Sequence, residues 1–216
     1  AVGFVYGVKV FKRKKFCRLL LFKIGFNLAD VHPSLAQSTI NKAIAFGLIT
    51  SYADSAKLAY LTGSPNFNPL YSNLVASGRD DYVAGKTLVD YMNASGDPRI
   101  AKYYQQDDNG NYVGATIGAS APFSNFSAPG TFAYTTTTPG IILNYTEVQF
   151  YLAEAAARFN IGGSAATLYN SAVTASFADW GLTAGAATAY LATKPYDATN
   201  YKKSIGEQAW VSFYNQ

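Results

Sequence analysis

The 216-residue sequence is poor in the residues that most often carry chemistry, since it contains one cysteine, one histidine and one methionine. Cys17 cannot form an internal disulfide, and an isolated thiol is expected to be a small buried apolar residue rather than a nucleophile. His32 has only Asp30 as a neighbour that could share a metal ion, so we predict a turn residue and no metal site. These scarcities disfavour metal and thiol chemistry.

Motifs of the common enzyme classes are also absent. The sequence contains no Gly-x-Ser-x-Gly, no phosphate-binding loop and no Gly-x-Gly-x-x-Gly. Glu147 and Glu154 share one face of a predicted helix, but the rise of 1.5 Å per residue separates them by about 10 Å. That distance is too long for a retaining glycosidase pair and at the limit for an inverting pair. We therefore predict no catalytic residue and no cofactor, and expect Glu154 to pair with Arg158 at i,i+4.

Long apolar runs are missing as well, because lysine or arginine interrupts every apolar stretch well before 18 residues, which excludes a transmembrane helix. The opening AVGFVYGVKV lacks the basic region and cleavage site of a secretory signal. The tetrad DNGN at 108–111 is typical of a hairpin tip, and its acidic spacing does not fit an EF-hand loop.

Charge is sparse, at 14% of residues, and unevenly placed. Seven of the 17 basic residues lie between Lys9 and Lys23, which leaves ten basic against 13 acidic residues elsewhere, a mildly acidic remainder. A basic run can bind nucleic acid or anionic lipid. The interleaved Phe11, Phe16 and Phe22 favour instead a helix with one solvated face, so no nucleic-acid partner is expected.

The sequence is centred on a predicted helical hairpin between Asn144 and Gly181. Thr146 and Gln149 have the spacing of a capping box, and Glu147 in the first turn complements the helix dipole. Gly162-Gly163 is expected to end the first helix, and Ser164 to cap the second. The apolar stripes comprise Val148, Tyr151, Leu152, Ala155 and Phe159 on the first helix, and Leu168, Ala172, Val173, Phe177 and Trp180 on the second. About 34 residues is the size of a tetratricopeptide-type unit.

Further helices are predicted at 11–29, at 34–46, at 184–192 and from Asn200 onward. Pro33 is expected in the first turn of the second of these. One more helix is predicted from Asp80 or Asp81 to Gly96, with Tyr82 inside it. Trp180 and Trp210 fall on apolar stripes and are predicted to be core residues. Residues 48–78 and 114–140 lose the helical periodicity and are predicted to be long loops.

Aromatic residues make up 15% of the chain, with 17 tyrosines and 14 phenylalanines. Such rings suit ligands with both apolar and polar faces, such as sugars and peptides. The irregular segment 114–140 carries four of them, Phe123, Phe126, Phe132 and Tyr134, which we predict to bind ligand. The alternative is that these rings pin the loop to the helical core.

The segments LNYTEVQFYLAEAAARF and IGEQAWVSFY resemble the SusD/RagB family of outer-membrane lipoproteins. Asp97-Pro98-Arg99, followed by Tyr103-Tyr104 and then DDNGNYVG, is similar to that family's D-P-R-x-x-x-Y-Y region. The segment LADVHPSLAQSTINKAIAFGLITSYADSAKL is similar to its helix, proline break and helix. The resemblance extends from about Phe11 to Phe213, although the basic window departs from the family pattern.

The resemblance implies a mainly α-helical fold of tetratricopeptide-like hairpins with long irregular loops and a small β-hairpin. It also implies that residues 1–216 are a fragment of one longer SusD-like domain. The implied function is a surface lipoprotein of the outer membrane that captures oligosaccharides or peptides and delivers them to a SusC-like TonB-dependent transporter barrel. Its lipid anchor would lie outside this chain. The alternatives are a helical-repeat scaffold that binds only a protein partner, and a hydrolase whose active site lies in other sequence.

Overall fold

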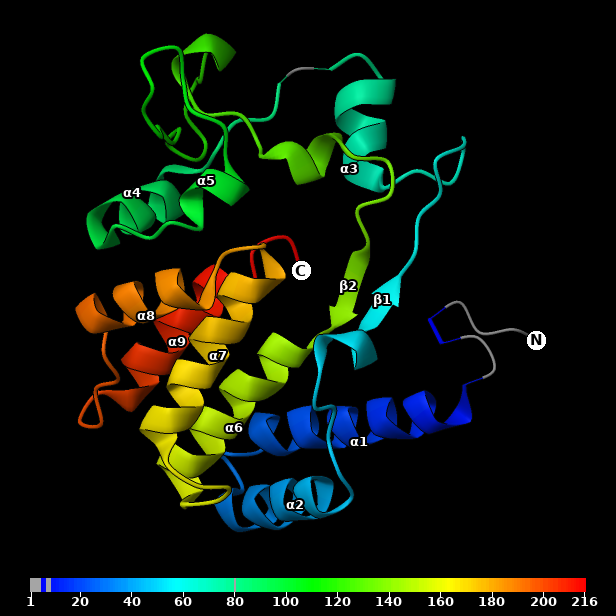
Figure 1. Ribbon diagram of the computed structural model, residues 1–216, viewed down its shortest axis with the longest axis vertical. Helices are drawn as coiled ribbons and strands as arrows, with labels where there is room; N and C mark the ends of the chain where they lie inside the picture. The colour runs from blue at the N-terminus through cyan, green and yellow to red at the C-terminus, as the bar shows by residue number, and fades with distance from the viewer. Residues whose placement is uncertain (1–4, 7–8, 80) are drawn as a thin grey trace. The chain divides into compact units, whose positions relative to one another are not determined.

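The computed structural model describes residues 5–6, 9–79 and 81–216, most of them in helices and long irregular connections (Figure 1). The chain forms two compact units. The first unit comprises the described residues up to Leu58, together with Ile141–Asp179 and Pro195–Gln216, and the second comprises Ala59–Gly140 and Trp180–Lys194. The prediction of a mainly helical fold is confirmed, while the prediction of one domain remains a prediction.

The first unit begins with two helices, α1 (Val10–Asn27) and α2 (Pro33–Ala45), which lie side by side in opposite directions (Figure 1). They approach closely at Gly25, where an added Cβ would lie 2.8 Å from the side chain of Ile40. Pro33 takes the first helical position, and His32 is the exposed cap residue before it, as predicted.

Helix α1 carries the basic window, but the expected division into one apolar and one solvated face holds only in part, because Phe11 is 65% exposed while the Lys15 side chain is only 16% exposed. Leu19, Phe22 and Gly25 are its buried residues. Lys15 pairs with Asp54 at 2.7 Å and Lys23 pairs with Glu147 at 2.8 Å. Cys17 was expected to be buried and is exposed, because it lies on the opposite side of α1 from the buried residues.

The predicted hairpin is present as α6 (Tyr145–Phe159) and α7 (Ala165–Asp179). The prediction of a capping box at Thr146 is wrong, because the N-cap residue of α6 is Asn144. The backbone of Asn144 is extended, and its side-chain oxygen accepts a hydrogen bond from the Glu147 amide at 2.8 Å. Thr146 already lies inside the helix. The helix ends at Asn160, which adopts the left-handed conformation (φ 55°) two residues before the expected glycine pair.

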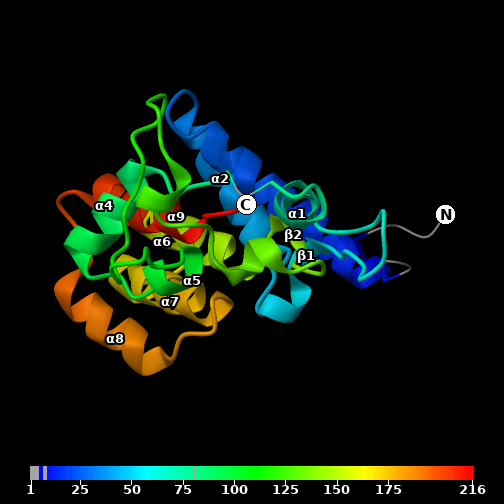
Figure 2. The same cartoon turned by 90° about the horizontal axis from the view of Figure 1, so that it is seen from above.

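Helix α9 (Tyr201–Ser212) packs on α6 and α7, and both views show it beside them (Figures 1 and 2). Its buried residues are Ile205, Gln208, Val211 and Ser212. Trp210 is therefore off the packed face and 46% exposed, so its prediction as a core residue is wrong. At 3.6 residues per turn, these buried positions share one face of the helix, and Trp210 lies on the opposite side.

A two-stranded sheet pairs β1 (Ala56–Leu58), which follows the 3₁₀ turn η1 (Tyr52–Asp54), with β2 (Gly140–Leu143). These strands are far apart in sequence, so the sheet is not a hairpin. At the expected hairpin tip the chain makes a turn in which Asp107 Oδ1 accepts hydrogen bonds from the amides of Asn109 and Asn111. No strand flanks this turn in the described part of the chain.

The second unit contains α3 (Pro69–Tyr71), the π-helical turn η2 (Ser72–Ala76), α4 (Lys86–Ser95), α5 (Ile100–Tyr103), the 3₁₀ turns η3 (Phe123–Asn125) and η4 (Thr131–Tyr134), and α8 (Ala184–Thr193). The prediction of a helix at 184–192 is confirmed.

Helix α4 starts later than predicted. Asp81 and Tyr82 precede the helix, and Asp80 lies outside the described residues. The intervening backbone is extended because Ala84 exchanges hydrogen bonds with a distant segment, donating to Ser127 O and accepting from Ala115 N, both at 2.8 Å. Tertiary pairing therefore overrides the local capping signal.

Candidate functional site

The predicted ligand-binding residues lie in the second unit, on two separate turns. Phe123 starts η3 and Phe126 directly follows it, whereas Phe132 and Tyr134 belong to η4. The turn η4 contacts α3 and α5, and α3 is labelled in Figure 1.

The four aromatic residues also differ in solvent exposure. Phe123 is 39% exposed, while Phe126, Phe132 and Tyr134 are half-buried. Phe132 packs edge-on against Trp180 with ring centroids 5.4 Å apart. Trp180 is half-buried and also contacts Tyr103 at 4.6 Å, so its predicted packing role holds in part. Of the four residues, Phe123 is the most exposed.

Sequence reasoning missed Ile117, which is 82% exposed, the largest exposed fraction among the large apolar side chains of the described residues. It lies in the same excursion of the chain as Phe123. The signal was available, because an isolated isoleucine between Gly114 and Gly118 has no helical or strand pattern to bury it.

The excursion that carries Ile117 and Phe123 is closed by a stem of hydrogen bonds. Ser127 is fully buried, and its amide donates to Val113 O at 2.8 Å while its hydroxyl accepts from Val113 N at 3.0 Å. Lys86 N donates to Ala115 O at 2.8 Å. The residues between these contacts, 116–126, are defined here as the loop tip, and they are mostly exposed.

A buried ion pair directly precedes α5 in the chain. The Arg99 guanidinium contacts the Asp97 carboxylate at 2.9 Å (Nε to Oδ1) and 2.6 Å (Nη2 to Oδ2), and both side chains are fully buried. Burial opposes the charge of Arg99, but the hydrogen bond and nearby negative groups outweigh it, so its pKa is raised. Arg99 also lies over the Tyr190 ring, 5.5 Å from the centroid, which joins the start of α5 to α8.

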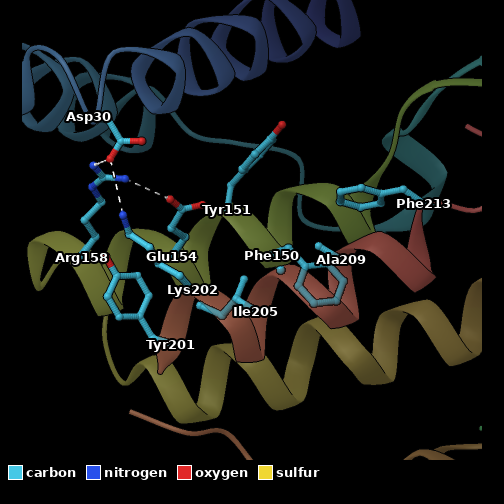
Figure 3. A pocket seen from close by; sticks show the side chains of 11 residues that line it. Asp30, Phe150, Tyr151, Glu154, Arg158, Tyr201, Lys202, Ile205, Ala209 and Phe213 are labelled. Atoms are coloured by element: carbon cyan, nitrogen blue, oxygen red, sulfur yellow. Dashed lines mark hydrogen bonds and ion pairs between the residues drawn. The ribbon is translucent and has the colours of Figure 1, made fainter. Parts of the chain in front are cut away.

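The first unit contains a cleft of about 270 Å³ between α6 and α9 (Figure 3). One end is apolar and is lined by Phe150, Ile205, Ala209 and Phe213. At the other end Arg158 pairs with Asp30 and with Glu154, the latter at 3.6 Å as predicted, and Lys202 lies 3.6 Å from Asp30. Burial raises the pKa of Glu154, although Arg158 opposes the shift. The charges in this cleft compensate one another.

The carboxylates of Glu147 and Glu154 have different partners. Glu147 is buried and accepts hydrogen bonds from Lys23 and from the Tyr151 hydroxyl, each at 2.8 Å. Glu154 lies in the cleft beside Arg158. Both therefore serve as ion-pair partners of the helices.

Within the residues that the structure describes, no group of three or more His, Cys, Asp or Glu side chains is placed to hold a metal ion. None of the described helices is long and apolar enough to cross a membrane.

An irregular loop with an exposed ring, held on a helical scaffold, is typical of a binding protein. Over residues 2–216 the sequence matches the SusD-like family described as "Starch-binding associating with outer membrane", and the chain belongs to this family. Among curated proteins, none matches significantly.

Solved structures agree with this membership. A chitin-binding protein is 24% identical with a TM-score of 0.82, covering 99% of this chain and 51% of its own. A SusD homologue from Bacteroides uniformis is 27% identical with a TM-score of 0.82, covering 98% and 51%. A chitin-binding SusD homologue from Flavobacterium johnsoniae is 23% identical with a TM-score of 0.80, covering 96% and 49%. This chain thus spans about half the length of these relatives.

Proposed function

We propose that this chain is part of a surface protein that captures oligosaccharides for uptake. Its family is described as starch-binding, and two of the similar structures are described as chitin-binding. Starch and chitin are both chains of pyranose rings, so the ligand class is an oligosaccharide. Peptides, whose planar amides also stack on rings, are the second ligand class to be tested.

The observation that carries the proposal is the presentation of Phe123 on an exposed loop beside Ser124 and Asn125. The apolar face of a pyranose ring packs on an aromatic side chain, while its hydroxyl groups exchange hydrogen bonds with hydroxyl and amide groups. One exposed ring with polar neighbours gives modest affinity. A protein that passes its ligand onward needs such affinity, because tight binding would prevent release.

We extend the proposal from this chain to a whole protein of the length of these relatives. Its location is the outer membrane surface, where a lipid attaches it, and its partner is a SusC-like TonB-dependent transporter barrel that receives the ligand. Its action is binding without turnover, so it is not an enzyme. The family description, with its association to the outer membrane, supports this extension.

Isothermal titration calorimetry with a chitin hexasaccharide, maltohexaose and an unrelated hexapeptide tests the proposal. We expect at least one oligosaccharide to bind with a Kd between about 1 μM and 1 mM, which corresponds to roughly −8 to −4 kcal/mol. Binding of the peptide alone would move the ligand class to peptides. Absence of binding to all three would favour the helical scaffold that binds only a protein partner.

A further inference from the structure

The loop tip has two buried glycines at its base. An added Cβ at Gly130 would lie 2.2 Å from the carbonyl oxygen of Lys102. At Gly114 an added Cβ would lie 2.5 Å from Lys86 Cα and 2.7 Å from Lys86 N. Real Cβ atoms do not approach backbone this closely, so both contacts require glycine. Neither glycine has a positive φ, so the reason for glycine here is space and not backbone conformation.

These glycines allow hydrogen bonds that a larger residue would break. Gly130 N donates to Tyr103 O at 2.7 Å, and Gln105 N donates to Ala128 O at 2.9 Å. At the other end, Ala115 N donates to Ala84 O at 2.8 Å. The two ends of the excursion are thus attached to different backbone segments, one directly before α4 and one at the C-terminal end of α5.

Ser127 joins the two ends to each other. Its amide and its hydroxyl both contact Val113, and its carbonyl accepts from Ala84 N. The side chain is fully buried, so these bonds are shielded from water. Eleven residues, 116–126, therefore leave and return through a closed base, and the exposed Ile117 and Phe123 lie within them.

We propose that Gly114, Ser127 and Gly130 are positioning residues that hold the loop tip in its ligand-binding conformation before the oligosaccharide arrives. Ile117 and Phe123 are the residues that contact the ligand, the first with an aliphatic surface and the second with an aromatic one. The inference rests on the proposed function. Its physical basis is that a loop ordered in advance loses less backbone entropy on binding than a loop that the ligand must order.

The test compares G130A with G63A by calorimetry and by hydrogen exchange. Gly63 is a matched control because it lies in an irregular segment of the same unit, and an added Cβ there meets nothing within 4 Å. The probe is whichever of the chitin hexasaccharide and maltohexaose binds the wild type. For G130A we expect faster amide exchange within 116–126 and about tenfold weaker binding, whereas G63A keeps both at the wild-type level.

S127A and F123A complete the test. S127A removes the two hydrogen bonds of the hydroxyl, from Val113 N and to Asn111 O, without adding bulk, so we expect it to fold and to show a smaller change of the same two kinds. F123A should weaken binding and leave amide exchange unchanged, since the ring is a contact residue and not part of the base. Circular dichroism of each variant confirms that the helices are intact.

Faster exchange in G130A and S127A with unchanged affinity would overturn the positioning role and leave the proposed function intact. Unchanged exchange in both variants would overturn it as well, since the base would not be what orders the tip. A wild-type chain that binds no oligosaccharide defeats the proposed function, and the positioning role falls with it.

Discussion

The Thr146 hydroxyl donates a hydrogen bond to the Asp179 carboxylate over 2.5 Å, joining the first turn of α6 to the last residue of α7. Asn144, the cap of α6, donates to the same oxygen at 3.3 Å. This contact closes the open end of the helical hairpin, opposite its connecting turn. Burial raises the pKa of Asp179 to about 6, although the Thr146 hydrogen bond and the charge of Lys57 oppose the shift.

We expect the D179N variant to be more stable than the wild type at pH 7.5. Because the folded-state pKa lies above the ordinary value of 3.8, the folded protein binds this proton more tightly than the unfolded chain, and stability falls as pH rises through about 6. Asparagine keeps the hydrogen bond from Thr146 without the buried charge. The gain is at most about 3 kcal/mol, reduced by partial exposure, and should vanish near pH 4.

Urea unfolding between pH 4 and pH 8 measures this difference, and D54N is the control of opposite sign. A hydrogen bond from Lys15 is the main cause that lowers the pKa of Asp54, with Lys12 adding to it. Its stabilising effect is therefore present at neutral pH and lost in acid, so D54N should be less stable at pH 7.5. A D179N variant less stable than the wild type at pH 7.5 would show that the ionised carboxylate is a net stabilising group.

The two tryptophans should respond differently to truncation. W180A removes a ring that packs on Tyr103 and Phe132, and we expect a loss of about 3 kcal/mol, the low end for a core aromatic residue. W210A truncates a side chain that is 46% exposed, so its loss should be about 1 kcal/mol. Chemical denaturation compares them directly, and a larger loss for W210A than for W180A would reverse their order of burial.

We expect the loss of either Asp97 or Arg99, the two residues of the buried ion pair, to lower the free energy of unfolding strongly. D97A leaves the guanidinium buried without its carboxylate, and R99A leaves the carboxylate without its cation, each at a cost of about 3 to 5 kcal/mol. R99K keeps the charge but loses the bidentate geometry, so it should rescue only part of this loss. Urea midpoints of the three variants provide the measurement, and a fully stable R99A would exclude a structural role for the pair.

Much of the helical architecture could be predicted from local sequence. The α6–α7 hairpin has apolar residues at helical spacing, a glycine turn and Ser164 before the second helix, and Pro33 marks the start of α2. These signals are local, so they survive without knowledge of the fold. The predictions that failed concern features that depend on partners distant in sequence. Strand β1 pairs with β2 from another part of the chain, and the hydrogen bonds of Ala84 make α4 begin later than predicted.

The side of a helix that becomes buried also depends on its neighbours, which explains the error at Trp210. The ligand-binding role of the four rings stays a prediction, and their exposure depends on neighbours in the same way. Composition nominated all four rings alike, and it could not separate the exposed Phe123 from Phe132, whose ring packs on Trp180. The buried base at Ser127 and Gly130 left no sequence signal, because serine and glycine are common in any loop.

Calorimetric titration of the wild type and of F123A, F126A, F132A and Y134A with the bound oligosaccharide tests the ligand site most directly. We expect F123A to weaken binding by about tenfold to a hundredfold, roughly 1 to 3 kcal/mol, because its ring is the most exposed of the four. The half-buried rings should have smaller effects, with F132A acting through its packing on Trp180. Wild-type affinity in all four variants would contradict the assignment and place the site elsewhere in the protein.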